Sequence, residues 1–253
     1  MRIALVQMRC KKGDIRGNLD SIGEAITAAE ARGIELIVFP EMSITGYIDP
    51  TRRPDAVLAL DSGFVEEFVL MTDGSNVTAI AGCVEHNPNG KPFITQIVAA
   101  SGEYAGWYRK RNVVDEELEW FAPGPSTACV FTHDTMTVGL AICADIDAPQ
   151  VFRDSARAGA HLIVESAAPG LYGQQATRDW QAGYDWWRGQ CHTKLGEHAR
   201  VNGVYIAVST QAGRTIDEDF PGGGYLFGPD GMCLAETDDW SECVLDVEIP
   251  DGA

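Results

Sequence analysis

Apolar residues in this chain form short continuous runs that alternate with stretches of helical spacing. Residues 34–39 form such a run, broken only by Glu35, which is typical of a strand covered on both faces. In residues 18–32 the apolar positions recur every three or four residues, and Gly33 follows as a stop signal. The pattern therefore predicts both buried strands and amphipathic helices.

Alternation of these elements predicts sheets covered by helices, in a single domain over residues 1–253. Residues 31–38 resemble residues 157–164, since each is a helix end that turns through glycine into a strand. This similarity fits either an ordinary αβ unit or a two-fold αβ layering. The predicted helices are residues 18–32, 149–159 and 179–202, and the predicted strands are residues 2–8, 34–39, 78–84, 93–99, 103–109, 128–132, 136–142, 161–165, 204–208, 222–227, 233–236 and 242–248.

The net charge of the chain limits the kinds of molecule that it can bind. The chain has 37 acidic and 19 basic residues and a formal net charge of −18. A nucleic acid needs a basic face, so this balance argues against a nucleic-acid partner and against attachment to an anionic membrane. The first residues enter a run of strand length with no signal-peptide pattern, and no apolar run reaches membrane-spanning length. We expect a cytoplasmic protein.

The seven cysteines are widely spaced, and no CxxC pair occurs. Neither a zinc knuckle nor a dithiol redox pair is therefore indicated. Cys143 differs from the others because it ends the apolar run of residues 137–142, just before a predicted helix. A nucleophile at such a turn projects from the sheet beside free backbone N–H groups, which can hold an oxyanion. A buried structural cysteine is the alternative.

Two charged residues also follow predicted strands. Glu41 ends the strand of residues 34–39, and Lys110 follows the strand of residues 103–109 in a short basic cluster. In open α/β sheets, sites lie at the carboxyl ends of strands, where a carboxylate can act as a base. A lysine there can stabilise an anionic intermediate. Taken alone, a residue like Glu41 is more often a helix N-cap or a surface group, and one like Lys110 is more often part of a solvated charge run.

Together these segments resemble the nitrilase (carbon–nitrogen hydrolase) superfamily. Residues 39–41 with 45–47 are similar to its glutamate block, residues 108–110 to its lysine block, and residues 139–145 to its nucleophile block. The order and spacing match, and the resemblance extends to residues 223–225 and 228–231 near the C-terminus. It implies a four-layer αββα sandwich, commonly paired with a second subunit, so we expect a homodimer or a higher homo-oligomer.

The resemblance also implies roles for individual residues. Cys143 would form a thioester with a small amide or carbamoyl substrate, Glu41 would act as general base, and Lys110 would stabilise the oxyanion. Glu119 best matches the family's second active-site glutamate, although Glu117 or Glu116 is close enough to replace it. Contacts with the oxyanion or the substrate are expected from Ala144, Tyr47 and Asn112.

No metal or other cofactor is expected, since no HExxH pattern occurs. Cys143-Ala144-Asp145 favours amides over nitriles, because the nitrile-hydrolysing branch typically has Cys-Trp-Glu. Loops near residues 46–56, 112–122 and 168–180 are expected to select the substrate. Acyl transfer to an amine, nitrile hydrolysis, a non-catalytic binding protein and a redox-sensing thiol protein remain as alternatives.

Overall fold

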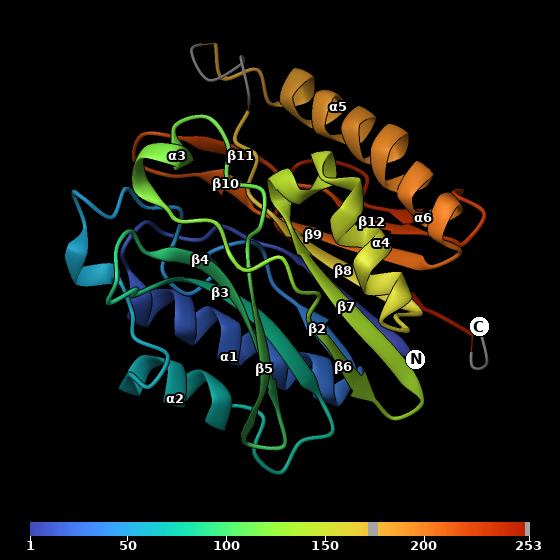
Figure 1. Cartoon of the computed structure of the whole chain (residues 1–253), viewed down its shortest axis with the longest axis horizontal. Helices are drawn as coiled ribbons and strands as arrows, with labels where there is room; N and C mark the ends of the chain where they lie inside the picture. The colour runs from blue at the N-terminus through green and yellow to red at the C-terminus, as the bar shows by residue number, and fades with distance from the viewer. Residues whose placement is uncertain (172–176, 251–253) are drawn as a thin grey trace.

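Two six-stranded mixed sheets form the centre of the molecule (Figure 1). The computed structural model describes residues 1–171 and 177–250. The sheets face each other, and helices cover their outer surfaces. This arrangement confirms the predicted fold class. Within the described part of the chain, no helix is both long and apolar enough to span a membrane.

The first sheet has the strand order β14-β1-β2-β3-β4-β5. Strands β1, β2 and β3 are parallel, and the remaining pairs are antiparallel. Helices α1 and α2 pack on this sheet. Its elements are β1 (Arg2–Gln7), α1 (Ile15–Ala31), β2 (Leu36–Val38), α2 (Gly63–Leu70), β3 (Thr78–Glu85), β4 (Phe93–Ala100), β5 (Glu103–Arg109) and β14 (Cys243–Glu248).

The second sheet repeats this plan with the order β13-β12-β9-β8-β7-β6. Strands β7, β8 and β9 are parallel, and helices α4 to α6 lie on its outer side. Its elements are β6 (Val130–His133), β7 (Met136–Ile142), α4 (Pro149–Arg157), β8 (Leu162–Ala167), α5 (Trp180–Gln190), α6 (Gly196–Asn202), β9 (Tyr205–Thr210), β12 (Gly224–Phe227) and β13 (Cys233–Glu236).

The similarity between residues 31–38 and 157–164 has a counterpart in three dimensions. These segments lead into β2 and β8, each of which is the middle strand of its sheet's parallel trio. The position in both sheets is therefore equivalent, as a two-fold αβ layering requires.

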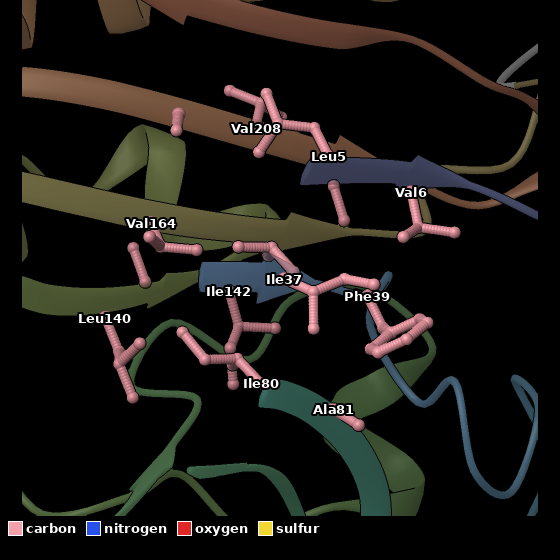
Figure 2. Close-up of a cluster of buried hydrophobic side chains, with 14 of the residues drawn as sticks. Leu5, Val6, Ile37, Phe39, Ile80, Ala81, Leu140, Ile142, Val164 and Val208 are labelled. Atoms are coloured by element: carbon pink, nitrogen blue, oxygen red, sulfur yellow. The ribbon is translucent and has the colours of Figure 1, made fainter. Parts of the chain in front are cut away.

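Side chains from both sheets meet in one hydrophobic core (Figure 2). Leu5 and Ile37 come from the first sheet, and Leu140, Ile142 and Val164 from the second; all are at most 1% exposed. Apolar burial of this extent holds the two sheets face to face. The ends of the strands, and the loops that follow them, are thereby fixed relative to each other.

Several short elements differ from the prediction. Residues 179–202 form one helical stretch as expected, but the π-helix η3 (Cys191–Leu195) separates α5 from α6. Helices of one or two turns and strands of three residues carry too few positions for a periodic signal, so the pattern does not reveal them. These are the 3₁₀-helices η1 (Pro54–Ala56) and η2 (Cys143–Asp147), the helices α2 and α3 (Glu117–Trp120), and the paired strands β10 (Ala212–Arg214) and β11 (Asp219–Pro221).

Candidate active site

Cys143 lies at the sharp turn where β7 passes into η2. Its φ angle is +44°, a left-handed conformation that is uncommon for residues other than glycine. The backbone N–H of Ala168 donates a hydrogen bond to its sulfur, and the thiol lies within hydrogen-bonding reach of the Glu41 carboxylate. Ala144 occupies the first turn of η2, where amide groups lack an intrahelical acceptor. The turn therefore places the thiol beside the first backbone N–H groups of η2.

Glu41, Lys110 and Glu117 form a buried ionic cluster next to this thiol. The Lys110 Nζ atom donates to Glu41 Oε1 at 2.9 Å and to Glu117 Oε1 at 2.7 Å. The Tyr47 hydroxyl donates to the same Glu117 oxygen at 2.8 Å. Glu41 and Lys110 are 0% and 1% exposed, so the charges interact with little screening by water.

Burial sets the protonation behaviour of this cluster. It raises the pKa of Glu41 to about 7; Lys110 opposes this shift and Glu117 adds to it. Burial, followed by the Glu41 carboxylate, raises the pKa of the Cys143 thiol well above its usual value. Burial alone lowers the pKa of Lys110, but the two carboxylates outweigh it and raise that pKa well above its usual value. At neutral pH the site thus holds a protonated thiol, an ammonium and a carboxyl that can exchange a proton.

The structure places Glu117 beside Lys110 and leaves Glu119 outside the cluster. Glu117 is 6% exposed, whereas the side chain of Glu119 is exposed to solvent. Both residues lie in α3, and residues two apart on a helix point about 200° away from each other. The expectation that Glu119 lies in the site is therefore wrong, and its alternative Glu117 occupies that position. Glu116 is also exposed.

Asn112 connects two loops and does not line the cavity. Its side-chain amide donates to the Ala144 carbonyl at 2.6 Å, and its backbone N–H donates to Asp145 Oδ1 at 2.8 Å. The other Asp145 oxygen accepts from the Tyr108 hydroxyl at 2.7 Å and from the Ile142 N–H at 3.0 Å. The lysine loop is thus fastened to the nucleophile turn. A direct contact between Asn112 and substrate, as expected from the sequence, finds no support in this geometry.

Asp145 and Tyr108 have no role in the sequence prediction, although both stand in the blocks that carry the resemblance. Burial raises the pKa of Asp145, and the hydrogen bonds from Tyr108 and from the backbone of Asn112 and Ile142 oppose that shift. The available signal was their position next to Lys110 and Cys143. Their partners, however, are distant in sequence and appear only in the folded chain.

An open cavity of about 1200 Å³ leads to Cys143 and Lys110. The predicted substrate loops near residues 46–56 and 112–122 line it. The third predicted loop, near residues 168–180, contributes Ala168 and Pro169, and its residues 172–176 lie outside the described residues. Trp186 and Trp187 of α5 form part of the wall, so this tryptophan pair faces the cavity. Residues 216–218 also line it, and no pattern in the sequence indicates their contribution.

The sheets, the buried cluster and the cavity define an α/β protein with a cysteine-centred site. The chain belongs to the carbon–nitrogen hydrolase family, whose sequence pattern, described as "Carbon-nitrogen hydrolase", matches residues 2–252.

Relatives of known name support this assignment. The chain is 32% identical over 190 residues to a glutamine-dependent NAD(+) synthetase of Thermotoga maritima. The aligned region covers 70% of this chain but only 32% of the length of the synthetase. It is 26% identical to N-carbamoylputrescine amidase of Arabidopsis thaliana over 259 residues, covering 96% of this chain and 84% of that protein.

Among solved structures, the fold is similar to that of an amidase from Nesterenkonia sp. AN1 in complex with butyramide. The TM-score is 0.83 at 24% identity, covering 99% of this chain and 91% of that one. Another structure of the same amidase shows acrylamide added to its active-site cysteine.

Proposed function

We propose that the protein hydrolyses the carbon–nitrogen bond of a small amide or carbamoyl compound through a thioester on Cys143. The observation that carries this proposal is the buried Lys110 ammonium held between the Glu41 and Glu117 carboxylates, beside a thiol at a strained turn. A thiol, a base and a cation within reach of one another match the requirements of nucleophilic catalysis.

In the first step, the Cys143 sulfur attacks the amide carbonyl carbon while Glu41 accepts the thiol proton. A general base is required because the raised pKa of Cys143 keeps the thiol protonated at neutral pH. Lys110 and the Ala144 N–H stabilise the negative charge on the substrate oxygen. Loss of one such donor costs about 3–4 kcal/mol in comparable sites.

The tetrahedral intermediate then collapses, and Glu41 returns the proton to the departing amine. Water attacks the thioester with Glu41 again as base, releasing the acid and the free thiol. A pKa of about 7 suits Glu41 to this alternation, because a group that both takes and gives a proton works best near the ambient pH. Glu117 and Tyr47 hold Lys110 in place.

The test is ammonia release from a panel of small amides and carbamoyl compounds, measured for the wild type and for Cys143→Ala. We expect release by the wild type alone, and an acyl adduct on Cys143 detectable by intact-protein mass spectrometry. Full activity of Cys143→Ala would exclude the mechanism. If the wild type releases no ammonia and its Cys143 is inert toward iodoacetamide, the protein is instead a binding protein.

A further inference from the structure

A second group of reactive side chains lies on the outer side of the second sheet. His192 stands in η3, while Cys233 and Glu236 stand at the two ends of β13, the edge strand of that sheet. One ring nitrogen of His192, the Cys233 sulfur and a Glu236 carboxylate oxygen all lie within 4.8 Å of one another. His192 Nε2 is already 2.8 Å from Glu236 Oε2.

Neighbouring side chains fix the orientation of these groups. The His192 ring meets Phe227 and Tyr225 edge-on, with ring centroids 5.5 and 6.1 Å apart. Arg188 in α5 donates to both Glu236 oxygens, at 2.6 and 2.8 Å. Metal-binding sites commonly have such a surrounding layer, in which ligating carboxylates accept further hydrogen bonds and ligating rings are held in one orientation.

We propose that His192, Cys233 and Glu236 form a zinc-binding site separate from the catalytic centre. Zinc prefers nitrogen, sulfur and oxygen ligands at about 2.0–2.3 Å, which places the ligand atoms of a tetrahedral site roughly 3.3–3.8 Å apart. To reach this spacing, the His192 and Glu236 ligand atoms, now 2.8 Å apart, must separate slightly, and the Cys233 sulfur must settle within the 4.8 Å that already encloses all three ligand atoms. Neutral His192, the Cys233 thiolate and the Glu236 carboxylate balance the charge of the ion, and the thiol proton is released to solvent on binding. A water molecule completes the four ligands.

The position of η3 explains why three ligands meet here. A π-helical turn inserts an additional residue into a helix and is frequent at functional sites. This turn brings His192 over β13, whereas Gln190 and Lys194, two residues before and after it, line the substrate cavity. Zinc held by His192 therefore ties one wall of the cavity to the edge strand of the sheet.

A second group, Glu35, His133 and Asp134, also brings ligand atoms within 4.8 Å of one another. It contains no sulfur, Asp134 is exposed, and the Nδ1 atom of His133 is hydrogen-bonded to the Thr78 hydroxyl at 2.9 Å. Its oxygen-rich ligands are a weaker match for zinc. It serves as an internal comparison.

The experiment uses Co²⁺ as a spectroscopic substitute for zinc, added to reduced Cys143→Ala protein so that the catalytic thiol cannot bind the metal. We expect a thiolate-to-cobalt charge-transfer band and tetrahedral d–d bands that saturate at one ion per chain and disappear when Zn²⁺ is added. Cys233→Ser should remove the charge-transfer band, and His192→Ala should weaken binding at least tenfold. Cys243→Ser, which changes an exposed cysteine, is the matched control and should leave the spectrum unchanged.

The proposal is wrong if no charge-transfer band forms, or if it persists in Cys233→Ser. Thermal unfolding provides a second readout that does not depend on sulfur. Zn²⁺ should raise the Tm of the parent protein, because a ligand that binds the folded state stabilises it, but not that of His192→Ala. An equal rise in both would place the metal elsewhere, for example at His133. None of these outcomes depends on amide hydrolysis.

Discussion

At the scale of single residues, Glu117 and Glu119 provide a matched pair. They share one short helix, yet only Glu117 contacts the Lys110 ammonium. We expect Glu117→Gln to reduce kcat/KM about 10²-fold or more, because a charged partner of the lysine is lost. Glu119→Gln should remain within about twofold of the wild type. Steady-state ammonia release decides this, and equal losses in the two variants would contradict the assignment.

The pH dependence of kcat/KM tests whether Glu41 is the general base. Glu41 must be ionised to accept the thiol proton, so activity should rise about tenfold per pH unit below its pKa of about 7 and level off above it. Because the Glu117 carboxylate raises the pKa of Glu41, Glu117→Gln should move this midpoint to lower pH. The observed midpoint belongs to the coupled group of charges. A midpoint that stays in place or rises in Glu117→Gln would count against Glu41 as the base.

Glu165 makes a separate prediction, about stability. It is 0% exposed in β8, and within the described chain neither of its carboxylate oxygens has a hydrogen-bond partner. Burial, with added repulsion from Asp145 and Glu41, raises its pKa well above the usual 4.5. The folded state therefore keeps the proton where the unfolded state loses it. The contribution of Glu165 to the free energy of unfolding is therefore fully present below pH 4.5, and it decreases as the pH rises towards the pKa of the folded state.

Each pH unit in that window should cost the wild type about 1.4 kcal/mol relative to Glu165→Gln, which carries no titrating group there. Urea unfolding of both proteins at several pH values between about 5 and 8 measures the difference. Glu119→Gln, at an exposed position, is the control and should track the wild type. Parallel stability curves for Glu165→Gln and the wild type would show that Glu165 ionises normally.

The sequence could identify Glu41, Lys110 and Cys143 as candidates because each stands at the end of a predicted strand and because together they match three ordered blocks of the family. It could not choose between Glu117 and Glu119, since α3 has only four residues and no periodic signal. Nor could it place Asn112 between two loops, because its partners Ala144 and Asp145 are far away in sequence. The direction in which a loop side chain points depends on such long-range contacts.

At the scale of elements, the loops that carry the site share left-handed turns. Met42, Asp115 and Cys143 have φ angles of 50°, 49° and 44°. Met42 directly follows Glu41, and Asp115 lies two residues before Glu117. Non-glycine residues in this region cost energy and persist where the surrounding structure enforces them, often at functional sites. Packing between elements is what holds these turns.

Gly82 of β3 provides this support for the Glu41 turn. A Cβ atom at Gly82 would lie 2.6 Å from the Met42 backbone nitrogen, closer than atoms can pack. Gly82→Ala should therefore destabilise the fold by about 1–3 kcal/mol and reduce kcat, because the turn behind Glu41 must move. Gly63→Ala, where an added Cβ would have no neighbour within 4 Å, is the control. Urea unfolding and ammonia release together measure both effects, and wild-type behaviour of Gly82→Ala would refute the close approach.

Most of the long strands and helices were predictable because their sequence patterns extend over many residues. Residues 103–109 form β5 with the predicted bounds, whereas β2 contracts from residues 34–39 to Leu36–Val38. The ladder with β1 and β3 sets that length, and pairing partners are not visible in a local pattern. Likewise, η3 interrupts the predicted helix although residues 179–202 contain no proline.

At the scale of the whole molecule, the acidic excess extends into the cavity. Lys110 belongs to the catalytic cluster, and each of the other basic side chains that line the cavity is also in an ion pair with an acidic residue. Asp115 and Glu116 also line the cavity, and neither forms an ion pair with any residue in the described ranges. The mouth therefore carries uncompensated negative charge. The pairs are Lys12 with Asp217 and Glu218, Arg52 with Asp49, Arg53 with Asp55, and Lys194 with Asp147.

This charge should favour amides with a distant ammonium group. We expect kcat/KM to fall in the order 5-aminopentanamide, pentanamide, 5-amino-5-oxopentanoate, with each step about fivefold, since a unit charge near a solvated carboxylate gains about 1 kcal/mol. The preference should shrink in high salt, which screens exposed charges, and in the double variant Asp115→Asn, Glu116→Gln. Glu119→Gln, an acidic change outside the cavity lining, should keep the order. If the anionic amide were the best substrate, or if salt left the order unchanged, the paired cations of the cavity would have to be available to substrate after all.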